Sequence, residues 1–421
     1  MTQPVRVIVI GGGAAGFFGA IRCATTSPLA QVTLLEAATE PLGKVRISGG
    51  GRCNVTHHCF DPALLVQHYP RGGKALRGAF TRFQPRDIVT WYEQRGVRLK
   101  TETDGRMFPM TDDSGTIIDC LMNEARRAGI TLRTRTAVQA VKREKQGFTV
   151  VLRSQETLQC DRLLLATGSS PRGHQIAAVL GHTIEPPVPS LFTFNVPDRS
   201  LQALAGVSVN SAVVKLLVPN TKPLTQAGPV LITHWGFSGP AILKLSAWGA
   251  RTLHATHYQG TLQINWLPIC NSEQLRQTLQ AARNNTPKRA IWNHCPINLP
   301  KRLWRYWLQQ ADLSETVTWA NLPKKTLNTL VDAISRGVYP IQGKGIFKDE
   351  FVTCGGIKLA EVDFKTMASR RCPNLFFAGE VLDIDGVTGG FNFQSAWTTG
   401  WIAGQSLGKL NHNPVSTDHT T

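Results

Sequence analysis

The sequence predicts an α/β protein whose parallel-sheet domain is built from both ends of the chain and is interrupted by a β-rich domain with a helical insert. Three observations support this prediction. The chain opens with an apolar strand, a glycine turn and a helix. Two further apolar strands end in glycine turns near residues 168 and 379. Between these two strands, β-branched runs give way to helical periodicity and then return.

The length and composition are those of a folded protein with more than one domain. The chain has 421 residues, 42% hydrophobic and 18% charged, so it can bury a sizeable core, and wholesale disorder is excluded. Its nine cysteines lack paired spacing, which favours reduced thiols over a disulfide framework. The sequence contains neither a run of eighteen apolar residues nor a recognisable signal peptide. We therefore expect a cytoplasmic protein with no membrane partner.

The opening strand and turn predict a phosphate-binding site. Residues 5–10 are β-branched, as in a short buried strand, and a helical pattern follows the glycines. Gly11 permits the tight turn, Gly13 lets a pyrophosphate approach the backbone, and Gly16 lets the helix pack close to the strand. The helix N-terminus adds free N–H groups and a partial positive charge. The predicted phosphate contacts are Gly11, Gly13, Ala14, Ala15 and Gly16.

A carboxylate after the second strand indicates the class of ligand. Residues 31–35 form the predicted strand, and Glu36 follows, twenty residues after Gly16. A carboxylate at this place accepts hydrogen bonds from a ribose diol and disfavours a 2′-phosphate. The prediction is a Rossmann-like dinucleotide-binding unit, and the alternative is a Rossmann-type fold that has lost its ligand.

Two strands farther along the chain favour FAD over NAD as the dinucleotide. The first, over residues 162–165, leads into a glycine turn, and the second, over 374–378, closes on a Gly-Glu pair. A phosphate site with companion pieces ~150 and ~370 residues downstream is typical of a large FAD-binding domain with inserts. The cofactor residues predicted in these two turns are Thr167, Gly168, Gly379 and Glu380.

The middle of the chain predicts the interrupting domain. Three prolines within residues 186–189 cannot continue a helix or a central strand and mark a boundary. Strands are expected over 191–196, 208–218 and 261–266, helices over 273–283, 301–311 and 322–336, and a strand again over 351–353. The predicted boundaries are 1–188 and 361–410 for the two parts of the FAD-binding domain, 189–268 and 338–360 for those of the β-rich domain, 269–337 for the helical insert and 411–421 for a disordered tail.

The chain resembles the BaiN-like family of bacterial flavoproteins in three stretches that span nearly its whole length. They are residues 43–56, with the specific block Ser-Gly-Gly-Gly-Arg-Cys-Asn, residues 233–240 and residues 377–392. The resemblance implies a Rossmann-like FAD-binding domain interrupted by a β-rich domain that carries a helical insert. It also implies reduction of C=C bonds, with bile-acid-type molecules and ribosomal RNA uridine both in view. Cys354 stands where the family usually has a small or Pro-like residue, and we interpret it as a small hydrophobe.

Further cofactor residues follow from this resemblance and from position. The resemblance implies that Val138 lies beside the adenine and that the glycine run at 389–390 lines the flavin. Lys44 and the glycine loop 49–51 lie where the FAD domain folds back over the cofactor, and N–H groups of a glycine run can bind flavin or phosphate oxygens. The residues added to the site are Lys44, Gly50, Gly51, Asn54, Val138, Gly390, Phe391 and Asn392.

The net charge of +18, from 46 Lys and Arg against 28 Asp and Glu, predicts a polyanionic partner such as nucleic acid or an anionic lipid surface. A merely basic soluble enzyme is the alternative. Ten basic and four acidic residues lie within 266–336, and basic clusters recur within 71–86 and 126–135. If these groups converge, they form an RNA-sized footprint read by shape and backbone charge. For any single helix a solvated face is the simpler interpretation, and no obligate protein partner is evident.

Three residues are candidates for the chemistry. Arg52 can hold a substrate phosphate or stabilise an anionic reduced flavin, or it braces its loop. Cys53 can donate the proton that C=C reduction requires, although free cysteines are usually inert packing residues. His234 can donate a proton near neutral pH, or it is a structural hydrogen-bonding group in a tight turn. The C-x₃-H-H-C spacing that starts at Cys53 matches no common zinc site, so no metal is predicted.

These expectations combine into one hypothesis: an FAD-dependent oxidoreductase that takes electrons from NAD(P)H and converts uridine in ribosomal RNA to dihydrouridine. The hydride would go to C6 of the pyrimidine and the proton to C5, and the base would have to leave its stack. Two alternatives remain open. One is a flavin reductase or oxidase of a small metabolite, and the other is a non-catalytic RNA-binding factor that contains FAD.

Overall fold

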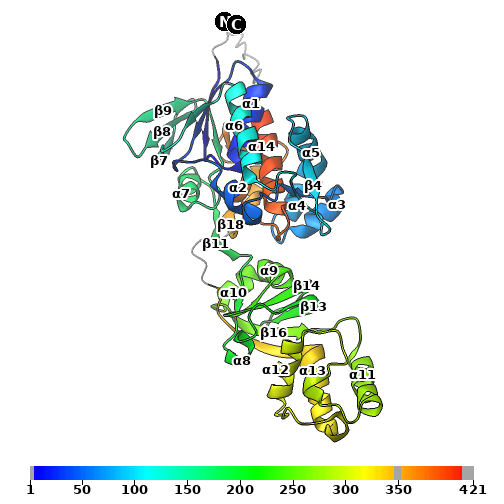
Figure 1. Cartoon of the computed structure of the whole chain (residues 1–421). Coiled ribbons are helices and arrows are strands. Elements are labelled where there is room, and N and C mark those ends of the chain that lie inside the picture. The colour runs from blue at the N-terminus through cyan, green and yellow to red at the C-terminus, as the bar shows by residue number, and fades with distance from the viewer. Residues whose placement is uncertain (1–3, 346–351, 410–421) are drawn as a thin grey trace, which may run out of the picture. The chain divides into compact units, whose positions relative to one another are not determined.

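The computed structural model describes residues 4–345 and 352–409. The chain divides into two compact units, Met1–Pro187 with Thr353–Thr421 and Val188–Val352 (Figure 1). The tail predicted to be disordered, 411–421, lies outside the described residues. Within the described residues, every helix is too short or too polar to cross a bilayer.

A seven-stranded sheet forms the centre of the first unit. Its strand order is β19-β20-β21-β10-β1-β2-β6, and the pairs from β21 to β6 are parallel. Because β21, β10 and β1 are parallel neighbours, the turns after them meet at one edge of the sheet. The predicted α/β class is thereby confirmed. The bounds are β1 Arg6–Ile10, β2 Gln31–Leu35, β6 Thr131–Arg133, β10 Arg162–Leu165, β19 Val362–Asp363, β20 Ala368–Ser369 and β21 Leu375–Phe377.

Two helices from opposite ends of the chain pack together beside this sheet. α1 (Ala14–Thr26) contacts α14 (Phe391–Gly408), and both lie with α6 (Ser114–Arg127) on one side of the sheet in Figure 1. A β-carbon at Gly404 would lie 2.3 Å from the Gly19 carbonyl oxygen, so the two helices meet at backbone contact distance. Glycine at this crossing is therefore required by packing.

Two small sheets and several short helices complete the first unit. One sheet has the order β3-β5-β4, and the other, β7-β8-β9, lies on the side of the main sheet away from α1 in Figure 1. The strands are β3 Thr56–His57, β4 Leu99–Thr101, β5 Arg106–Pro109, β7 Val138–Arg143, β8 Phe148–Leu152 and β9 Thr157–Cys160. The helices are α2 Gly43–Ile47, α3 Pro62–Leu65, α4 Gly73–Phe80, α5 Pro85–Glu93 and α7 Pro171–Val179.

A two-stranded ribbon of β11 (Ile184–Ser190) and β18 (Val352–Ile357) lies at the boundary between the units. The three prolines expected to mark a boundary lie inside β11, where they are tolerated because each strand of a two-stranded ribbon is an edge strand. From Thr353 onward β18 belongs to the first unit. The last sheet strand of the second unit, β17, ends at residue 342, and the return of the β-rich domain over 338–360 stays a prediction.

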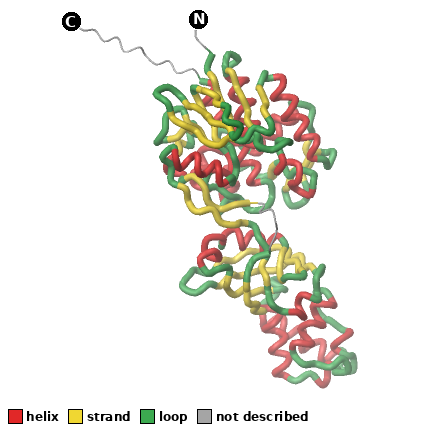
Figure 2. Tube along the Cα trace, turned by 90° about the vertical axis from the view of Figure 1, so that its left-hand side faces the viewer, coloured by secondary structure: helices red, strands yellow, loops and turns green. Residues whose placement is uncertain are grey.

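The second unit holds a six-stranded antiparallel sheet of order β12-β15-β14-β13-β16-β17. Its strands are β12 Phe194–Asn195, β13 Ser208–Leu217, β14 Leu224–Thr233, β15 Gly236–Ser238, β16 Gln259–Asn265 and β17 Gly337–Gln342. Its helices are α8 Arg199–Gln202, α9 Pro240–Trp248, α10 Ala250–Ala255, α11 Ser272–Asn285, α12 Lys301–Gln310 and α13 Lys324–Arg336. Helices α11–α13 lie together at one end of this unit (Figure 2), and one core of buried side chains joins them to the sheet.

Candidate cofactor site

The glycine turns after β1, β10 and β21 are brought together, as their predicted common ligand requires. A β-carbon at Gly11 would lie 2.4 Å from the carbonyl oxygen of Ala166, which ends the strand before the second turn. A β-carbon at Gly379 would lie 2.8 Å from Cβ of Ala15 in the first turn of α1. Three segments separated by hundreds of residues thus form one surface at the carboxyl edge of the sheet.

The first of these turns keeps an open face. Gly13 is the N-cap of α1, no side chain caps the helix there, and nothing lies within 4 Å of the position a β-carbon would take. At Gly16 the same test places the β-carbon 1.8 Å from the Gly11 carbonyl oxygen. The N–H groups at this helix end therefore face a space that an anionic group can enter. This arrangement fits the pyrophosphate of FAD.

Glu36 lies next to the first turn. Its carboxylate accepts hydrogen bonds from the N–H groups of Gly12, at 2.7 Å, and Ala38, at 2.8 Å. The chain after β6 runs alongside, because the Thr136 N–H donates to the Glu36 carbonyl at 2.8 Å. Val138, which is buried, begins β7 two residues later. The residues predicted for the ribose and for the adenine therefore share one region of the first unit.

Lys44 and Glu380 join the two ends of the chain by an ion pair. The Lys44 Nζ lies 2.5 Å from Oε2 of Glu380, and Oε1 of Glu380 accepts from the Thr353 N–H at 2.9 Å. A β-carbon at Gly168 would lie 3.8 Å from the same Oε2. The neighbouring Thr167 Oγ1 is buried and has no hydrogen-bond partner among the described residues. The predicted cofactor residues Lys44, Thr167, Gly168 and Glu380 therefore lie together, and the charges of Lys44 and Glu380 neutralise each other.

The glycine loop over 49–51 presents backbone rather than side chains. Its three residues have φ of 59°, 72° and 87°, in the left-handed region that favours glycine. A β-carbon at Gly49 would lie 2.8 Å from the Phe108 ring, whereas nothing lies within 4 Å of those positions at Gly50 and Gly51. The loop is closed on the Phe108 side and leaves space for a ligand at Gly50 and Gly51, although the Gly51 N–H already donates to the Ser48 carbonyl at 3.1 Å.

Arg52 is held by its own neighbourhood. Its guanidinium lies 2.7 Å from Glu102 and 3.5 Å from Asp112, and it stacks over the Phe108 ring at 4.0 Å from the ring centroid. The hydrogen bond to Glu102 and the nearby acidic charges raise the pKa of Arg52. These contacts are those of a residue that braces its loop, the alternative that the sequence left open.

Cys53 is enclosed by the protein. Its side chain is 0% exposed, its φ is 62°, and burial raises the pKa of its thiol to about 12, although a hydrogen bond with Ser48 opposes this. A group so enclosed reaches neither substrate nor solvent in this conformation. The structure thus places Cys53 as a packing residue, the alternative given for it.

The turn before α14 is fastened by side-chain amides. The Asn54 amide, oriented to suit both neighbours, donates to the Thr56 carbonyl at 3.0 Å and accepts from the Gly390 N–H at 2.9 Å. The Asn392 amide accepts from the Gly386 N–H at 2.8 Å and donates to the Gly386 carbonyl at 2.9 Å. Both predicted cofactor residues thus shape the backbone of the glycine turn.

Two histidines beside this turn were not among the predicted site residues. The Phe391 ring stacks with the imidazoles of His57 and His68, with ring centroids 4.7 and 4.2 Å away, and the two imidazole centroids lie 5.9 Å apart. Cδ2 of His57 would also lie 3.4 Å from a β-carbon at Gly389. In the sequence His57 entered only a rejected zinc pattern. Their nearness to residues 389–391 comes from the fold, and no local pattern signals it.

His234 belongs to a different unit from the predicted FAD residues. It is exposed, in the turn between β14 and β15, and belongs to the second unit, whereas the predicted FAD residues belong to the first. His234 and the other predicted catalytic residues, Arg52 and Cys53, therefore belong to different units.

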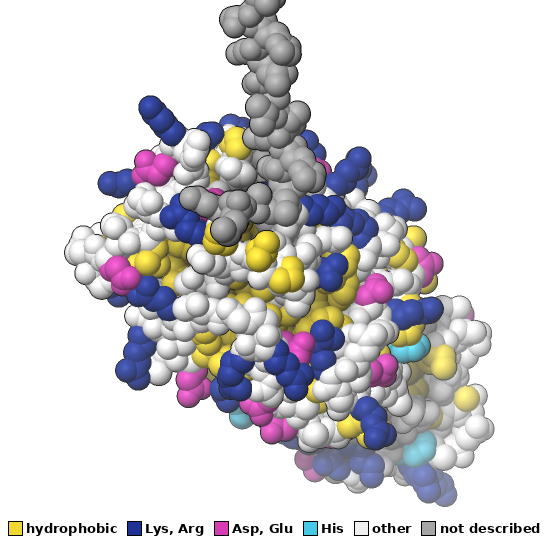
Figure 3. All heavy atoms as spheres, turned by 90° about the horizontal axis from the view of Figure 1, so that it is seen from above, with side chains coloured by type: hydrophobic (Ala, Val, Ile, Leu, Met, Phe, Trp, Pro, Cys, Tyr) yellow, Lys and Arg dark blue, Asp and Glu magenta, His cyan; other side chains and the backbone are white. Residues whose placement is uncertain are grey.

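The basic clusters of the first unit are partly neutralised within it. Arg71 forms a buried ion pair with Asp385, and Arg133 pairs with Glu156 at 2.6 Å. In Figure 3 Lys and Arg side chains are interspersed with Asp and Glu over the face in view.

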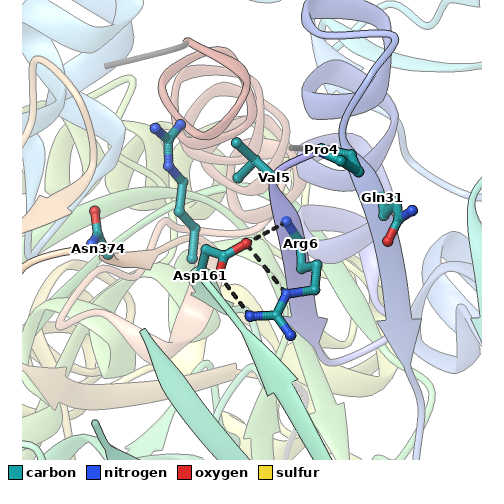
Figure 4. A pocket seen from close by; sticks show the side chains of 7 residues that line it. Pro4, Val5, Arg6, Gln31, Asp161 and Asn374 are labelled. Atoms are coloured by element: carbon teal, nitrogen blue, oxygen red, sulfur yellow. Dashed lines mark hydrogen bonds and ion pairs between the residues drawn. The ribbon is translucent and has the colours of Figure 1, made fainter. Parts of the chain in front are cut away.

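A hollow of about 650 Å³ on the first unit, lined by residues that include the Arg6–Asp161 pair, lies at the amino ends of the strands (Figure 4). It is at the edge of the sheet opposite the glycine turns.

Comparisons with known proteins place the whole chain. It matches the family described as HI0933-like protein Rossmann domain over residues 5–406. It is 32% identical over 414 residues to the ribosomal RNA dihydrouridine synthase of Escherichia coli (strain K12), covering 95% of this chain and 97% of that protein. It is 28% identical over 413 residues to the 3-dehydro-bile acid delta(4,6)-reductase of Clostridium scindens, covering 95% and 98%. The relationship predicted from the three sequence stretches is confirmed.

A solved structure shares the fold. The 3-ketosteroid-delta4-(5alpha)-dehydrogenase from Rhodococcus jostii RHA1, in complex with 4-androstene-3,17-dione, aligns with a TM-score of 0.52 at 14% identity. The alignment covers 97% of this chain and 98% of that one. At this identity the likeness concerns the fold alone.

Proposed function

The chain belongs to the HI0933-like Rossmann family and is an FAD-dependent oxidoreductase, and from this premise we propose that it reduces uridine in ribosomal RNA to dihydrouridine with electrons from NAD(P)H. The observation that carries the proposal is the full-length match, at 32% identity, to a ribosomal RNA dihydrouridine synthase. The net charge of +18 supports a polyanionic substrate.

Different residues at the carboxyl edge of the sheet would bind different parts of FAD. The turn from Gly11 to Gly16 would hold the pyrophosphate, Glu36 the ribose, and Val138 would lie beside the adenine. The backbone at Gly50 and Gly51 and the glycine turn before α14 would lie against the flavin ring. When bound, FAD supplies hydride transfer to the C=C bond.

The chain itself must supply a proton to the second carbon. Cys53 is enclosed, so we assign this role to His57, whose imidazole lies against Phe391 and near Gly389, in the turn expected to line the flavin. The Phe391 ring and the His68 imidazole lie against this imidazole, and its Nε2 lies 3.1 Å from the Asp104 carbonyl oxygen. Ring contacts and a backbone acceptor therefore orient the imidazole.

The experiment that tests the proposal is dihydrouridine mapping of ribosomal RNA. A strain lacking the gene should lose one dihydrouridine from its ribosomal RNA, and the purified holoenzyme should restore it to that RNA in the presence of NADH or NADPH. Unchanged dihydrouridine in the deletion strain would reject the proposal. His57→Asn holoenzyme should retain FAD and lose about 100-fold or more of this rate.

A second candidate function rests on the bile-acid relative. The match to the 3-dehydro-bile acid delta(4,6)-reductase covers 95% of this chain at 28% identity, which supports reduction of a C=C bond in a small steroid-like molecule. Turnover of a 3-dehydro-4,6-diene bile acid, with ribosomal RNA left unreacted, would favour this candidate.

A further inference from the structure

Trp235 of the second unit is more exposed than tryptophans of that unit's core. The Trp235 side chain is 57% exposed, in the turn between β14 and β15. Trp266, Trp304 and Trp319, from the same unit, are each at most 1% exposed. An exposed indole ring lacks the favourable free energy that its burial would give. Such a ring is therefore a candidate for binding a ligand.

The turn that carries Trp235 is built rigidly. The Trp235 carbonyl accepts from the Val196 N–H at 2.8 Å, and Thr233 Oγ1 donates to the Gly236 carbonyl at 3.3 Å. Gly236 has φ of 146°, and a β-carbon there would lie 2.4 Å from the Phe194 carbonyl oxygen. A ring held by such a turn loses little conformational entropy when it binds a ligand.

Basic side chains lie on the segments that support this turn. Val196, bonded to Trp235, leads into α8, whose first residue is the exposed Arg199. Arg302 of α12 donates to the carbonyl of Ala203 at the end of α8, at 2.7 Å, and α8 and α12 are neighbours in Figure 1. Lys301 and Arg302 are both exposed.

The charge of the whole unit has the same sign. Residues 188–352 contain 17 Lys and Arg against 7 Asp and Glu, a net +10, whereas the longer remainder of the chain has 29 against 21, a net +8. The acidic residue nearest in sequence to Arg199, Asp198, already accepts hydrogen bonds from Tyr306 Oη at 2.6 Å and from the Leu201 N–H. The excess of cations over anions in the unit favours a phosphate-bearing partner.

We propose that Trp235 stacks on an unpaired base of the RNA, and that Arg199, Lys301 and Arg302 contact the neighbouring phosphates. Exposed aromatic rings beside cations are the means by which proteins hold single-stranded RNA, since every base has a face on which to stack. This inference rests on the proposed function and adds the mode of RNA recognition to it.

The test is fluorescence anisotropy of the holoenzyme with a labelled ribosomal RNA hairpin whose loop is unpaired, and with a fully paired duplex, over a range of KCl concentrations. Trp235→Ala should weaken hairpin binding about tenfold and leave duplex binding unchanged. Trp235→Phe should retain most of the hairpin affinity. Lys301→Ala should weaken both and lower the salt slope of hairpin binding by about 0.7.

Trp248→Ala is the matched control, because Trp248 is also exposed, at 37%, in the same unit and has no part in the proposed site. It should bind both RNAs as the wild type does. FAD content and thermal midpoint verify that each variant is folded. Wild-type affinity for the hairpin in Trp235→Ala overturns this inference and leaves the proposed function standing. Failure of the wild-type holoenzyme to bind either RNA overturns both.

Discussion

Gly13 and Gly16 lie three residues apart in one turn, yet a side chain would meet opposite surroundings at the two positions. At Gly13 a methyl group enters the open face expected to take the pyrophosphate, and at Gly16 it meets the Gly11 carbonyl. Gly13→Ala should therefore weaken FAD binding about tenfold or more while lowering the free energy of unfolding by less than about 1 kcal/mol. FAD titration of the apoprotein followed by urea unfolding measures both quantities.

Gly16→Ala is the counterpart of that variant. Its methyl group would lie 1.8 Å from a backbone oxygen, so α1 must move, and the free energy of unfolding should fall by about 1–3 kcal/mol. Equal losses of stability in the two variants would contradict the distinction between a packing glycine and a phosphate-facing one.

The enclosure of Cys53 gives a second prediction at the scale of the residue. Because burial raises the pKa of its thiol to about 12, Cys53 should resist alkylation in the native protein and react only after unfolding. Peptide mapping after iodoacetamide treatment measures this, with the partly exposed Cys59 as the internal reference. Cys53→Ala should keep its turnover within about twofold, whereas a general acid would cost about 100-fold or more.

The residues of the first turn were predictable from sequence because their requirements are local. The spacing of Gly11, Gly13 and Gly16 follows from one strand, one turn and one helix. The burial of Cys53 was not predictable, because it depends on residues that are distant in the sequence. One of them is the buried Tyr92, whose pKa is raised by burial and further by the Cys53 thiol. His57 was missed for the same reason: Phe391 reaches it from the other end of the chain.

At the scale of the element, a buried histidine ties the end of α7 to β20. Nε2 of His182 lies 2.7 Å from Oγ of Ser369, and Nδ1 lies 3.2 Å from the Ala177 carbonyl. Burial lowers the pKa of His182, and nearby Arg371 lowers it further, against opposing effects of the Ala177 carbonyl and Glu361. The folded state therefore binds fewer protons than the unfolded state as the pH falls toward the ordinary pKa of histidine.

The free energy of unfolding should accordingly be larger above that pKa and fall as the pH is lowered from about 7 to about 5. His182→Gln should give a shallower fall, measured by urea unfolding across this range. His58→Gln, at an exposed histidine of the same unit, is the control and should keep the wild-type slope. His174 is also buried and its pKa is lowered, so part of the slope should survive in His182→Gln. An unchanged slope would contradict this account of His182.

The bounds of elements with a regular hydrophobic repeat were predicted closely. The bounds of elements with an interrupted repeat were not. α11, α12 and α13 each begin and end within two residues of the predicted ranges, because their apolar faces repeat every three to four residues. β14 was missed, because Gly228 and Pro229 interrupt its alternation. The strand predicted over 191–196 is reduced to Phe194–Asn195, which pairs, among the described residues, with a three-residue strand and through an isolated bridge.

At the scale of the whole molecule, the second unit is one continuous stretch with a core of its own. Residues 191–345 contain the entire six-stranded sheet, helices α8–α13 and every buried side chain of that core. A stretch that closes its own sheet and core should fold without the rest of the chain. Expressed alone, 191–345 should show a cooperative urea transition by circular dichroism and should be colourless, since the glycine turns lie in the other unit.

Trp266→Ala in the excised segment tests whether that transition reports the core. Trp266 is 0% exposed and its Nε1 donates to Tyr339 Oη at 3.2 Å, so its loss should cost about 3–5 kcal/mol and abolish most of the transition. Trp248→Ala, at the protein surface, should leave it intact. A segment without a cooperative transition would mean that the sheet needs the first unit to fold. The proposed RNA-binding surface could then be studied only in the full chain.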